Sequence, residues 1–383
     1  MGNLLDKDVI HTFNHKYHTP PAAVISAPGR INLIGEHTDY TGGFVLPTAI
    51  DRSIKLAFSP IDEPKVRVHS IDLDEIREVK LTAINHDPEN WFEFIKGVAW
   101  AMKEMGHPIR GWQGVFTGDI PIGAGLSSSA ALEIAVVKAF CLASDITLLP
   151  TEMALIGKKA EIDWVGVNVG IMDQLISAGG KAGHAMFLDC KTLAYDFVAI
   201  PDEVTLVVLD TMTRRELTHS AYNTRRHEVA TAENILEVPS LREATLNDLI
   251  HKEPDLPQNV FKRAKHIVTE NERVQLCVKL MRNGDISGMG DLINESHISL
   301  RDDFEVSSAE LNTIVEISQG RPGCLGARMT GAGFGGCALA IIENEFLESF
   351  TKTVIVRYYK EKGIKPQIYP IRSSSGVHYK ILS

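Results

Sequence analysis

Residues 118–131 have the sequence GDIPIGAGLSSSAA, and this stretch indicates the fold more directly than any other. Residues 112–120 predict a strand that runs into it, and residues 128–143, apolar nearly all round, predict a buried helix that leaves it. Glycines allow backbone amides to approach an anion closely, and a helix N-terminus adds partial positive charge. The order strand, small-residue loop, helix therefore favours a phosphate-binding loop over a flexible turn that merely caps a helix.

Several better-known motifs do not fit this loop. A Walker A motif needs Gly-Lys-Ser/Thr at its end, which no position supplies. A nucleophile elbow needs glycine where Ser129 stands. A second glycine-rich loop, GAGFGG at residues 331–336, matches the dinucleotide fingerprint, but the following CALAII predicts a strand instead of the required helix. We interpret the second loop as a tight backbone turn that supports the first.

Length and charge limit the class of protein. A chain of 383 residues suggests two or three domains. Its 39 Lys and Arg against 49 Asp and Glu give a net charge of −10, which repels nucleic acid and anionic membranes. Backbone amides and a metal can still hold a small anion such as a nucleotide. No stretch reaches about 18 apolar residues. We therefore expect no nucleic-acid partner and no membrane partner.

The cysteine pattern indicates a reducing compartment. There are five cysteines, an odd number, and none forms a Cys-x-x-Cys pair. This argues against a disulfide framework and against a zinc ribbon. The N-terminal residues lack the basic start and apolar run of a signal peptide. We expect a cytoplasmic protein.

The rest of the chain alternates irregularly between strand and helix patterns. Strands are expected at residues 22–27, 31–34, 44–58, 65–81, within 184–210, within 325–342, and last at 367–372. Helices are expected at residues 4–18, 91–105, 151–165, over most of 215–320, and at 344–362. This pattern predicts an α+β protein rather than a doubly wound sheet. We divide it into an N-terminal lobe, 1–200, and a C-terminal lobe, 201–383.

Two further segments carry candidate functional side chains. In APGRINLIGEHTDY, residues 27–40, Glu36, His37 and Asp39 cluster in a turn. They could surround a polyhydroxylated ligand with hydrogen bonds, bind a metal, or serve only as turn and cap residues. In GIMDQ, residues 170–174, Asp173 is a candidate general base. Glu161 is a candidate magnesium ligand, although either acid could simply be solvated or cap a helix.

A third group of candidates is the histidines near the N-terminus. His11, His15 and His18 fall on one face of the expected helix at residues 4–18. The spacing permits a metal site, but a surface helix is the better interpretation.

Together these segments resemble the galactokinase family of the GHMP small-molecule kinase superfamily. GRINLIGEHTDY resembles the galactokinase signature, and IPIGAGLSSSAALE resembles the superfamily ATP loop. RMTGAGFGGC is similar to its third motif. The further similar stretches are VGVNVGIMDQ, SAYNTRR and ESHISLRDDFEVSSAEL. The matches run in the family's order from about residue 24 to residue 337.

The resemblance implies a fold and a reaction. The fold would be a two-lobed α+β GHMP-kinase-like fold. Its N-terminal lobe would hold a mixed sheet and helices, its C-terminal lobe would be ferredoxin-like, and the active site would lie in the cleft between them. The reaction would be ATP-dependent phosphorylation of D-galactose at its anomeric C1 hydroxyl, with Mg²⁺, giving galactose 1-phosphate and ADP at the entry to the Leloir pathway.

The resemblance also implies roles for individual residues. Asp173 would face the anomeric hydroxyl as the base, and Arg30 beside it would stabilise the transition state. Mg²⁺ would be held by Ser129 and Glu161, and Trp91 would lie near the adenine. ATP would lie over the loop residues Gly123, Ala124, Gly125, Leu126, Ser127, Ser128 and Ser129. The sugar would contact Glu36, His37, Thr38, Asp39, Gly170, Asp173 and Tyr222.

Three departures and two alternatives accompany the resemblance. Thr41 stands where Asn is usual, Trp91-Phe92-Glu93-Phe94 departs from Trp-x-Asn-Tyr, and Ser375-Gly376-Val377 replaces Gly-Asp-Gly-Ala. The same chemistry could act on N-acetylgalactosamine, arabinose or a uronic acid. A non-catalytic galactose sensor is an alternative from another class, but the complete loop and its acids favour catalysis. We expect a monomer whose partners are a small sugar and a nucleotide.

Overall fold

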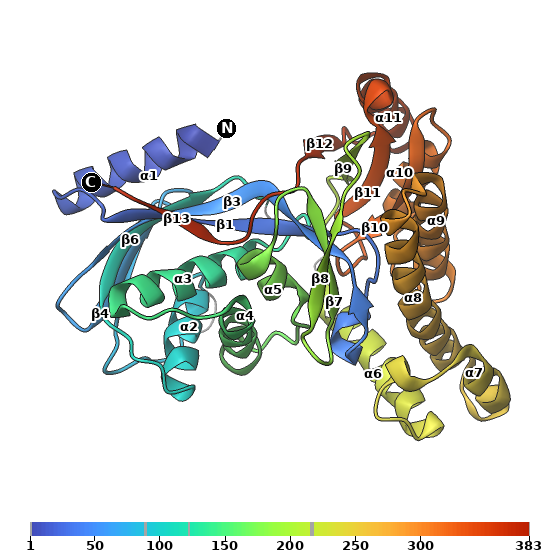
Figure 1. Cartoon of the computed structure of the whole chain (residues 1–383), viewed down its shortest axis with the longest axis horizontal. Helices are drawn as coiled ribbons and strands as arrows, with labels where there is room; N and C mark the ends of the chain where they lie inside the picture. Colours follow the sequence, from blue (N-terminus) through green and yellow to red (C-terminus); the bar gives the residue numbers. More distant parts are fainter. Residues whose placement is uncertain (1, 88–89, 122, 215–217, 383) are drawn as a thin grey trace.

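The computed structural model describes residues 2–87, 90–121, 123–214 and 218–382. Ile122, which belongs to the quoted phosphate loop, lies outside the described residues. Within these ranges the chain forms two lobes, at the left and right of Figure 1. Mixed sheets and helices without regular βαβ alternation confirm the predicted α+β class.

The N-terminal lobe is built on a mixed sheet whose described strands run in the order β13-β1-β3-β6-β4-β5. Only the β4–β6 pair of this sheet, among the described strands, is parallel. Helix α1 covers one face, and α2 to α5 cover the other (Figure 1). The strands are β1 (Ala23–Asn32), β3 (Pro47–Pro60), β4 (Lys65–Ser70), β5 (Glu75–Lys80), β6 (Trp112–Gly118) and β13 (His378–Ile381). The helices are α1 (Gly2–Tyr17), α2 (Glu93–Glu104), α3 (Ser128–Ser144), α4 (Pro150–Lys159) and α5 (Met172–Gly179).

A small antiparallel sheet lies between the two lobes (Figure 1). Its strands are β2 (Phe44–Val45), β7 (His184–Asp189) and β8 (Tyr195–Ala199). Short helical turns connect other elements. They are 3₁₀ turns at Asp39–Thr41, Leu241–Glu243, Glu253–Asp255 and Asn344–Phe346, and a π-helical segment at Ala160–Val165 that continues α4.

The C-terminal lobe has an antiparallel sheet in the order β10-β11-β9-β12. Its strands and the helices between them follow the β-α-β-β-α-β pattern, which confirms the predicted ferredoxin-like lobe. The strands are β9 (Val204–Asp210), β10 (Cys324–Thr330), β11 (Cys337–Glu343) and β12 (Gln367–Ile371). The helices are α6 (Thr218–Leu236), α7 (Leu246–Lys252), α8 (Gln258–Arg282), α9 (Ile286–Asp302), α10 (Ala309–Gln319) and α11 (Leu347–Lys362).

Each lobe has its own apolar core. Trp112 and Phe140 are fully buried between the large sheet and α3, and Phe304, Phe350 and Tyr358 are fully buried in the C-terminal lobe. Burying such a side chain stabilises the fold by about 1.5–3 kcal/mol. Helix α3 is buried over most of its surface, as its all-round apolar sequence predicts. Because this packing fixes α3, it also fixes the position of the phosphate loop that precedes the helix.

The prediction that the strand near 367–372 is the last one is wrong. A further strand, β13, follows it and pairs with β1, with Ile381 opposite Ala23 and His378 opposite Ser26. All four residues of β13 are exposed, and the short alternation of Val377, Tyr379 and Ile381 with polar residues was overlooked as a strand pattern. The division of the lobes at residue 200 stays a prediction, because β13 returns the chain to the N-terminal sheet.

One strand, β1, spans Ala23–Asn32, where two separate pieces are predicted within residues 22–34. Strand β1 continues through Pro28 and Gly29, with a register shift between Pro28 and Arg30. A Cβ on Gly29 would lie 2.7 Å from the Leu126 carbonyl oxygen, and the Arg30 amide donates to that oxygen at 3.2 Å. The bulge therefore brings the phosphate loop directly onto β1.

Candidate active site

The two glycine-rich loops lie against each other, as the sequence predicts. A Cβ on Gly331 would lie 3.4 Å from the Gly125 carbonyl oxygen, and the left-handed backbone at Gly331 (φ +84°) favours glycine there. A cavity of about 310 Å³ separates the loops. It is lined by Gly123, Ala124, Gly125, Arg214, Thr330, Ala332, Gly333, Gly335 and Gly336. Such a backbone-lined hollow beside a helix N-terminus is suited to phosphate groups.

The serines after the loop point toward two different carboxylates. Ser127 has a left-handed backbone (φ +60°) and donates its hydroxyl to Asp173. Ser128 begins α3, and the Ser129 hydroxyl lies 3.4 Å from Oε1 of Glu161. Ala124 and Leu126 are buried and anchor the loop to the core. The loop thus connects the core, the candidate base and the candidate metal ligand.

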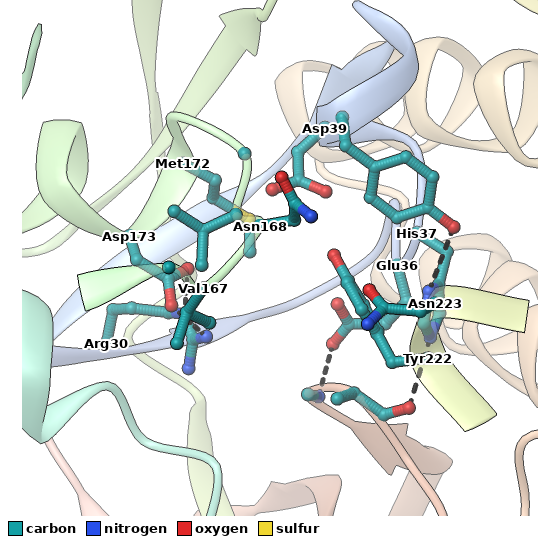
Figure 2. A pocket seen from close by; sticks show the side chains of 16 residues that line it. Arg30, Glu36, His37, Asp39, Val167, Asn168, Met172, Asp173, Tyr222 and Asn223 are labelled. Atoms are coloured by element: carbon teal, nitrogen blue, oxygen red, sulfur yellow. Dashed lines mark hydrogen bonds and ion pairs between the residues drawn. The ribbon is translucent and has the colours of Figure 1, made fainter. Parts of the chain in front are cut away.

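A second cavity, of about 220 Å³, is lined in part by Gly331 and Ala332 of the second glycine-rich loop (Figure 2). Arg30 and Asp173 form one side of it, and His37, Glu36 and Tyr222 form the opposite side. Polar and aromatic side chains facing a small cavity suit a sugar-sized, hydroxyl-rich ligand. Of the predicted sugar contacts, Glu36, His37, Asp39, Gly170, Asp173 and Tyr222 line this cavity.

Arg30 and Asp173 form a bidentate ion pair between β1 and α5. Nε of Arg30 lies 2.7 Å from Oδ1, and Nη2 contacts Oδ2. The remaining Nη1 donates to the Gly125 carbonyl oxygen. Burial alone would lower the pKa of Arg30, but Asp173 outweighs it and raises that pKa. Arg30 is therefore a fixed cation between the two cavities.

Glu36 connects the turn that follows β1 to the second glycine-rich loop. Its Oε1 accepts hydrogen bonds from Thr330 Oγ1 and the Gly331 amide, both at 2.8 Å, and from Arg328 at 3.2 Å. Its Oε2 accepts from Asn32 at 3.2 Å. The side chain is nearly fully buried. Much of its hydrogen-bonding capacity is thus used within the protein.

His37 is held neutral at the wall of the sugar-sized cavity. Burial lowers the pKa of His37 to about 4 and outweighs the opposing effect of Glu36. Its Nδ1 lies 3.2 Å from the Tyr40 hydroxyl, and its Nε2 lies 3.2 Å from the Ala332 carbonyl oxygen. The ring also packs against Tyr222, with centroids 5.6 Å apart. One nitrogen therefore donates and the other accepts at any pH above 5.

Asp39 and Gly170 approach each other so closely that no side chain fits at residue 170. A Cβ there would lie 1.7 Å from Oδ2 of Asp39. Burial, together with the charges of Asp173 and Glu36, raises the pKa of Asp39 to about 6. Predicted Thr38, by contrast, is fully buried and donates its hydroxyl to the Gly35 and Phe44 carbonyl oxygens. Thr38 therefore shapes the turn and does not line the cavity.

Glu161 belongs to a buried acidic group beside Ser129. Gln174 donates its amide to Oε2 of Glu161 at 2.7 Å and to Oε2 of Glu133 at 3.1 Å. Burial raises the pKa of Glu133 and of Glu161, and each is raised further by a neighbouring carboxylate. Among the residues that the structure describes, Oε1 of Glu133 has no hydrogen-bond partner. A hard cation beside Ser129 and Glu161 would relieve this excess of buried negative charge.

Neither the Glu36–Asp39 turn nor the N-terminal histidines form a cluster of metal-binding side chains within the described part of the chain. Among the described residues, no group of three or more His, Cys, Asp or Glu could hold a metal ion. Ser129 and Glu161 supply two oxygen ligands, which is the usual protein share for Mg²⁺ when substrate phosphates supply others. The residues therefore fit Mg²⁺ bound together with a nucleotide. His11 and His15 lie on α1, on the far face of the sheet from α3 (Figure 1).

Trp91 lies away from both cavities described above. Its indole nitrogen donates to Glu75 at 3.0 Å, and its ring packs against Phe116. It adjoins Asn90 and Phe92, which line a surface hollow of about 410 Å³. Its adenine role stays a prediction.

Several cavity residues were missed by sequence reasoning. Tyr40, Asn168, Met172 and Asn223 line the sugar-sized cavity, and Arg214 lines the phosphate-sized one. Each is near a recognised segment, but no residue type or spacing marked it. Arg214 is tethered to Asp210 by two hydrogen bonds of 2.8 and 2.7 Å. Its proximity to Gly123 could only be found from the folded chain.

Helix α8 holds the sugar-side turn from behind through three side chains that the sequence did not indicate. Glu270 accepts from the Gly35 amide at 3.0 Å, and Asn271 accepts from the Phe44 amide at 2.8 Å. His266 lies 3.1 Å from the Glu36 carbonyl oxygen. All three side chains are buried. The C-terminal lobe therefore sets the shape of a turn that belongs to the N-terminal lobe.

Family profiles match three parts of the chain. The galactokinase galactose-binding signature matches residues 11–60, the GHMP kinase N-terminal domain matches residues 93–181, and the GHMP kinase C-terminal domain matches residues 277–353.

Curated relatives match nearly the whole chain. The galactokinase of Roseiflexus sp. (strain RS-1) is 40% identical over 370 residues, covering 95% of each chain. The galactokinase of Chloroflexus aggregans is 42% identical over 371 residues, again covering 95% of each chain.

Two solved structures resemble the structure of this chain. The Lactococcus lactis galactokinase complexed with galactose superposes with a TM-score of 0.93 and 34% identity, covering 96% of this chain and 98% of that one. The Methanococcus jannaschii mevalonate kinase, 20% identical, has a TM-score of 0.66 and covers 92% of this chain and 98% of its own, which shows the shared fold.

Proposed function

The chain belongs to the galactokinase family, and we infer from this that it is an enzyme that phosphorylates galactose with ATP. We propose that the accepting group is the C1 hydroxyl and that the products are galactose 1-phosphate and ADP. The observation that carries this function is the Arg30–Asp173 pair, which joins the sugar-sized cavity to the phosphate loop. A related sugar as substrate is not favoured, because the similar proteins are galactokinases and one was solved with galactose. A non-catalytic sensor is not favoured, because sugar pocket, phosphate loop and base occur together.

We propose that Asp173 accepts a hydrogen bond, and then the proton, from the sugar hydroxyl. Its carboxylate is held by Arg30 and Ser127 but is still 27% exposed toward the cavity. Phosphoryl transfer passes through a loose transition state, in which positioning contributes more than covalent help. Asp173 therefore first orients the hydroxyl and takes its proton as the new bond forms.

We propose that Arg30 stabilises charge on the transferring phosphoryl group. It is buried, always charged, and hydrogen-bonded to the Gly125 carbonyl in the loop that would hold ATP. A cation already fixed in place needs no reorganisation when charge develops. Arg214, at the other side of the loop, is a second cation within reach of the phosphates.

We propose Ser129 and Glu161 as the protein ligands of Mg²⁺. The ion, when bound, would neutralise phosphate charge. Residues 123–129 would surround the phosphates through backbone amides and hydroxyls, and Trp91 would border the adenine side through the hollow beside Asn90.

We propose that His37, Asp39 and Tyr222 contact the sugar directly. Glu36, with one oxygen already saturated, would both contact the sugar and hold the Gly331 loop. Gly170 would supply backbone only, because no side chain fits beside Asp39. Thr38 would act through the shape of the turn.

The test is ADP release from Mg²⁺-ATP against galactose, 2-deoxygalactose, N-acetylgalactosamine, glucose, arabinose and glucuronate, with Asp173→Asn as the blank. Release led by galactose is expected. Release led by another sugar would retain the chemistry and reassign the substrate. Tight galactose binding by calorimetry without release would favour the sensor.

We also propose a cytoplasmic monomer. All five cysteines are free thiols, as expected in a reducing compartment. Within the described ranges, no helix has the length and apolarity needed to cross a membrane. Sedimentation velocity would test the oligomeric state, and cell fractionation the compartment.

A further inference from the structure

We propose that Gln174 is a positioning residue for the metal side of the reaction: its amide holds the Glu161 carboxylate beside Ser129. The proposal rests on the assignment of Ser129 and Glu161 as metal ligands made above. Neither the resemblance nor the cavity lining assigns Gln174 a role. It is fully buried and lies outside the residues that line either cavity.

The amide of Gln174 joins three separate elements. From the first turn of α5 it donates one hydrogen to Glu161 in the π-helical segment, at 2.7 Å. It donates the other to Glu133 on α3, at 3.1 Å. Both hydrogens of one NH₂ group are therefore used, one for each carboxylate. No apolar side chain could replace this bridge, because two buried acceptors would lose their donor.

Glu161 needs this support because its other described contact is weak. The Ser129 hydroxyl is 3.4 Å away, near the limit of a hydrogen bond. The backbone of Glu161 lies in the irregular π-helical segment Ala160–Val165, where side-chain directions differ from those of a regular helix. Without Gln174, Glu161 would be free to turn away from the other negative charges around it. The shorter bond thus decides where the carboxylate points.

Gln174 also fixes the distance between the metal side and the sugar side. It follows Asp173 directly, and neighbouring residues on a helix point about 100° apart. Asp173 therefore faces Arg30 and the sugar-sized cavity, while Gln174 faces Glu161. The same helix is anchored to β1 by the Ser177 hydroxyl, which donates to the Pro28 carbonyl oxygen at 2.8 Å. One turn of α5 thereby aligns both sides of the reaction.

The expected consequence is a selective loss of metal affinity. Removing a group that orients a metal ligand commonly lowers metal affinity by about 10- to 100-fold. Sugar binding should change little, because it uses Asp173, which points in a different direction from α5 than Gln174 does. A general loosening of the fold would weaken both.

The experiment compares Gln174→Met, which keeps the length of the side chain, with the wild-type enzyme. Mn²⁺ binding is measured by electron paramagnetic resonance with a non-hydrolysable ATP analogue, and galactose binding by calorimetry. We expect the Mn²⁺ concentration needed for half-saturation to rise at least about tenfold. The galactose Kd should stay within about twofold of the wild-type value. Ser318→Ala is the matched control, because it removes one buried hydrogen bond, to the Ile314 carbonyl oxygen in α10, and Ser318 lines neither cavity, so Mn²⁺ binding should stay unchanged.

Two results would overturn the proposal. One is wild-type Mn²⁺ half-saturation in Gln174→Met, and the other is an equal loss of Mn²⁺ and galactose affinity. Glu161→Gln separates the failures: if it leaves Mn²⁺ binding intact, the metal-ligand assignment itself is wrong. If Gln174→Met is unfolded by circular dichroism, Gln174→Asn carries the same test, because its amide is one methylene too short to bridge both carboxylates.

Discussion

Nε of Arg30 lies 2.7 Å from Oδ1 of Asp173, and the second guanidinium nitrogen contacts Oδ2, so a strand of the large sheet and a helix above it meet in a planar, two-bonded ion pair. The third nitrogen of the same guanidinium donates to the Gly125 carbonyl oxygen. A single arginine therefore touches both the proposed base and the phosphate loop. The distance between base and loop depends on this residue.

Asp173→Asn is expected to abolish galactose-dependent ADP release while leaving ATP affinity nearly unchanged. The amide cannot take the hydroxyl proton, and the loop that holds ATP keeps its own backbone contacts. Single-turnover ADP formation measures the first effect, and calorimetry with ATP the second. A turnover rate within tenfold of the wild type would remove the proposed role of Asp173.

Arg30→Lys is expected to lower kcat by about 100-fold or more, with a smaller change in either KM. Lysine keeps the positive charge, but it cannot make the two parallel bonds to Asp173 and the third to Gly125. Steady-state kinetics with each substrate varied in turn separates kcat from KM. A change confined to the galactose KM would reassign Arg30 to sugar binding.

Gly170→Ala is expected to raise the galactose KM by at least tenfold, with the ATP KM little changed. The added methyl would lie 1.7 Å from Oδ2 of Asp39, so Asp39 must move. Gly320→Ala is the matched control, because the nearest atom to a Cβ there is 3.6 Å away. Equal effects of the two substitutions on galactose KM would show that Asp39 is not a sugar contact.

The pH dependence of galactose use should follow Asp39. Burial and the nearby Asp173 and Glu36 raise the pKa of Asp39 to about 6, so the carboxyl is protonated below pH 6. The protonated form loses acceptor capacity, and kcat/KM for galactose should fall as pH decreases through 6. Asp39→Asn should remove this dependence at a lower plateau, as initial rates between pH 5 and 8 would reveal. If kcat/KM of Asp39→Asn still falls below pH 6, the titrating group is not Asp39.

Asp39 should also make the fold less stable at high pH. A carboxyl whose pKa is raised on folding binds its proton more tightly in the folded state, so stability falls as pH rises from about 4 to about 6. Asp39→Asn should therefore raise the Tm at pH 8. An unchanged or lower Tm would mean that the ionised carboxylate is better compensated than its surroundings indicate.

Glu270→Met is expected to lower the free energy of unfolding by about 3–5 kcal/mol. Glu270 is fully buried and accepts from the Gly35 amide, from Ser296 and from Arg273. Its removal leaves the largely covered Arg273 without its partner. Glu348→Ala is the control: its pair with Lys352 is 83% and 73% exposed, so the change should stay within about 0.5 kcal/mol. Urea unfolding measures both variants, and similar values would contradict the structural role of Glu270.

The sequence was sufficient wherever the chemistry lies in consecutive residues. The phosphate loop, the Glu36–Asp39 turn and the Asp173 segment are each continuous, and the predicted strand, loop and helix around Ser127–Ser129 are present. The helical C-terminal half and the closing α11 were also predicted, because apolar spacing marks them directly.

The features that the sequence did not predict depend on contacts between residues far apart in the chain. Gly170 and Asp39 meet through folding, and so do Gln174 and Glu133, and Glu270 and Gly35. In the sequence alone, each of these residues is an ordinary glycine, amide or acid. Strand β13 has only four residues, and its brief alternation of Tyr379 and Ile381 with polar residues does not show that it pairs with β1. What the sequence could not show was which polar side chains are buried, because burial depends on the neighbour across the fold.

The pairing of β13 with β1 has a consequence for how the protein is made. Residue 381 lies beside residue 23, so the first strand of the large sheet leaves the ribosome long before the strand that covers its open edge. During translation the nascent chain carries an unpaired backbone edge on β1, where another chain could attach. A ribosome that stalls before codon 378 would hold a chain with both glycine-rich loops, yet without the strand that closes its sheet.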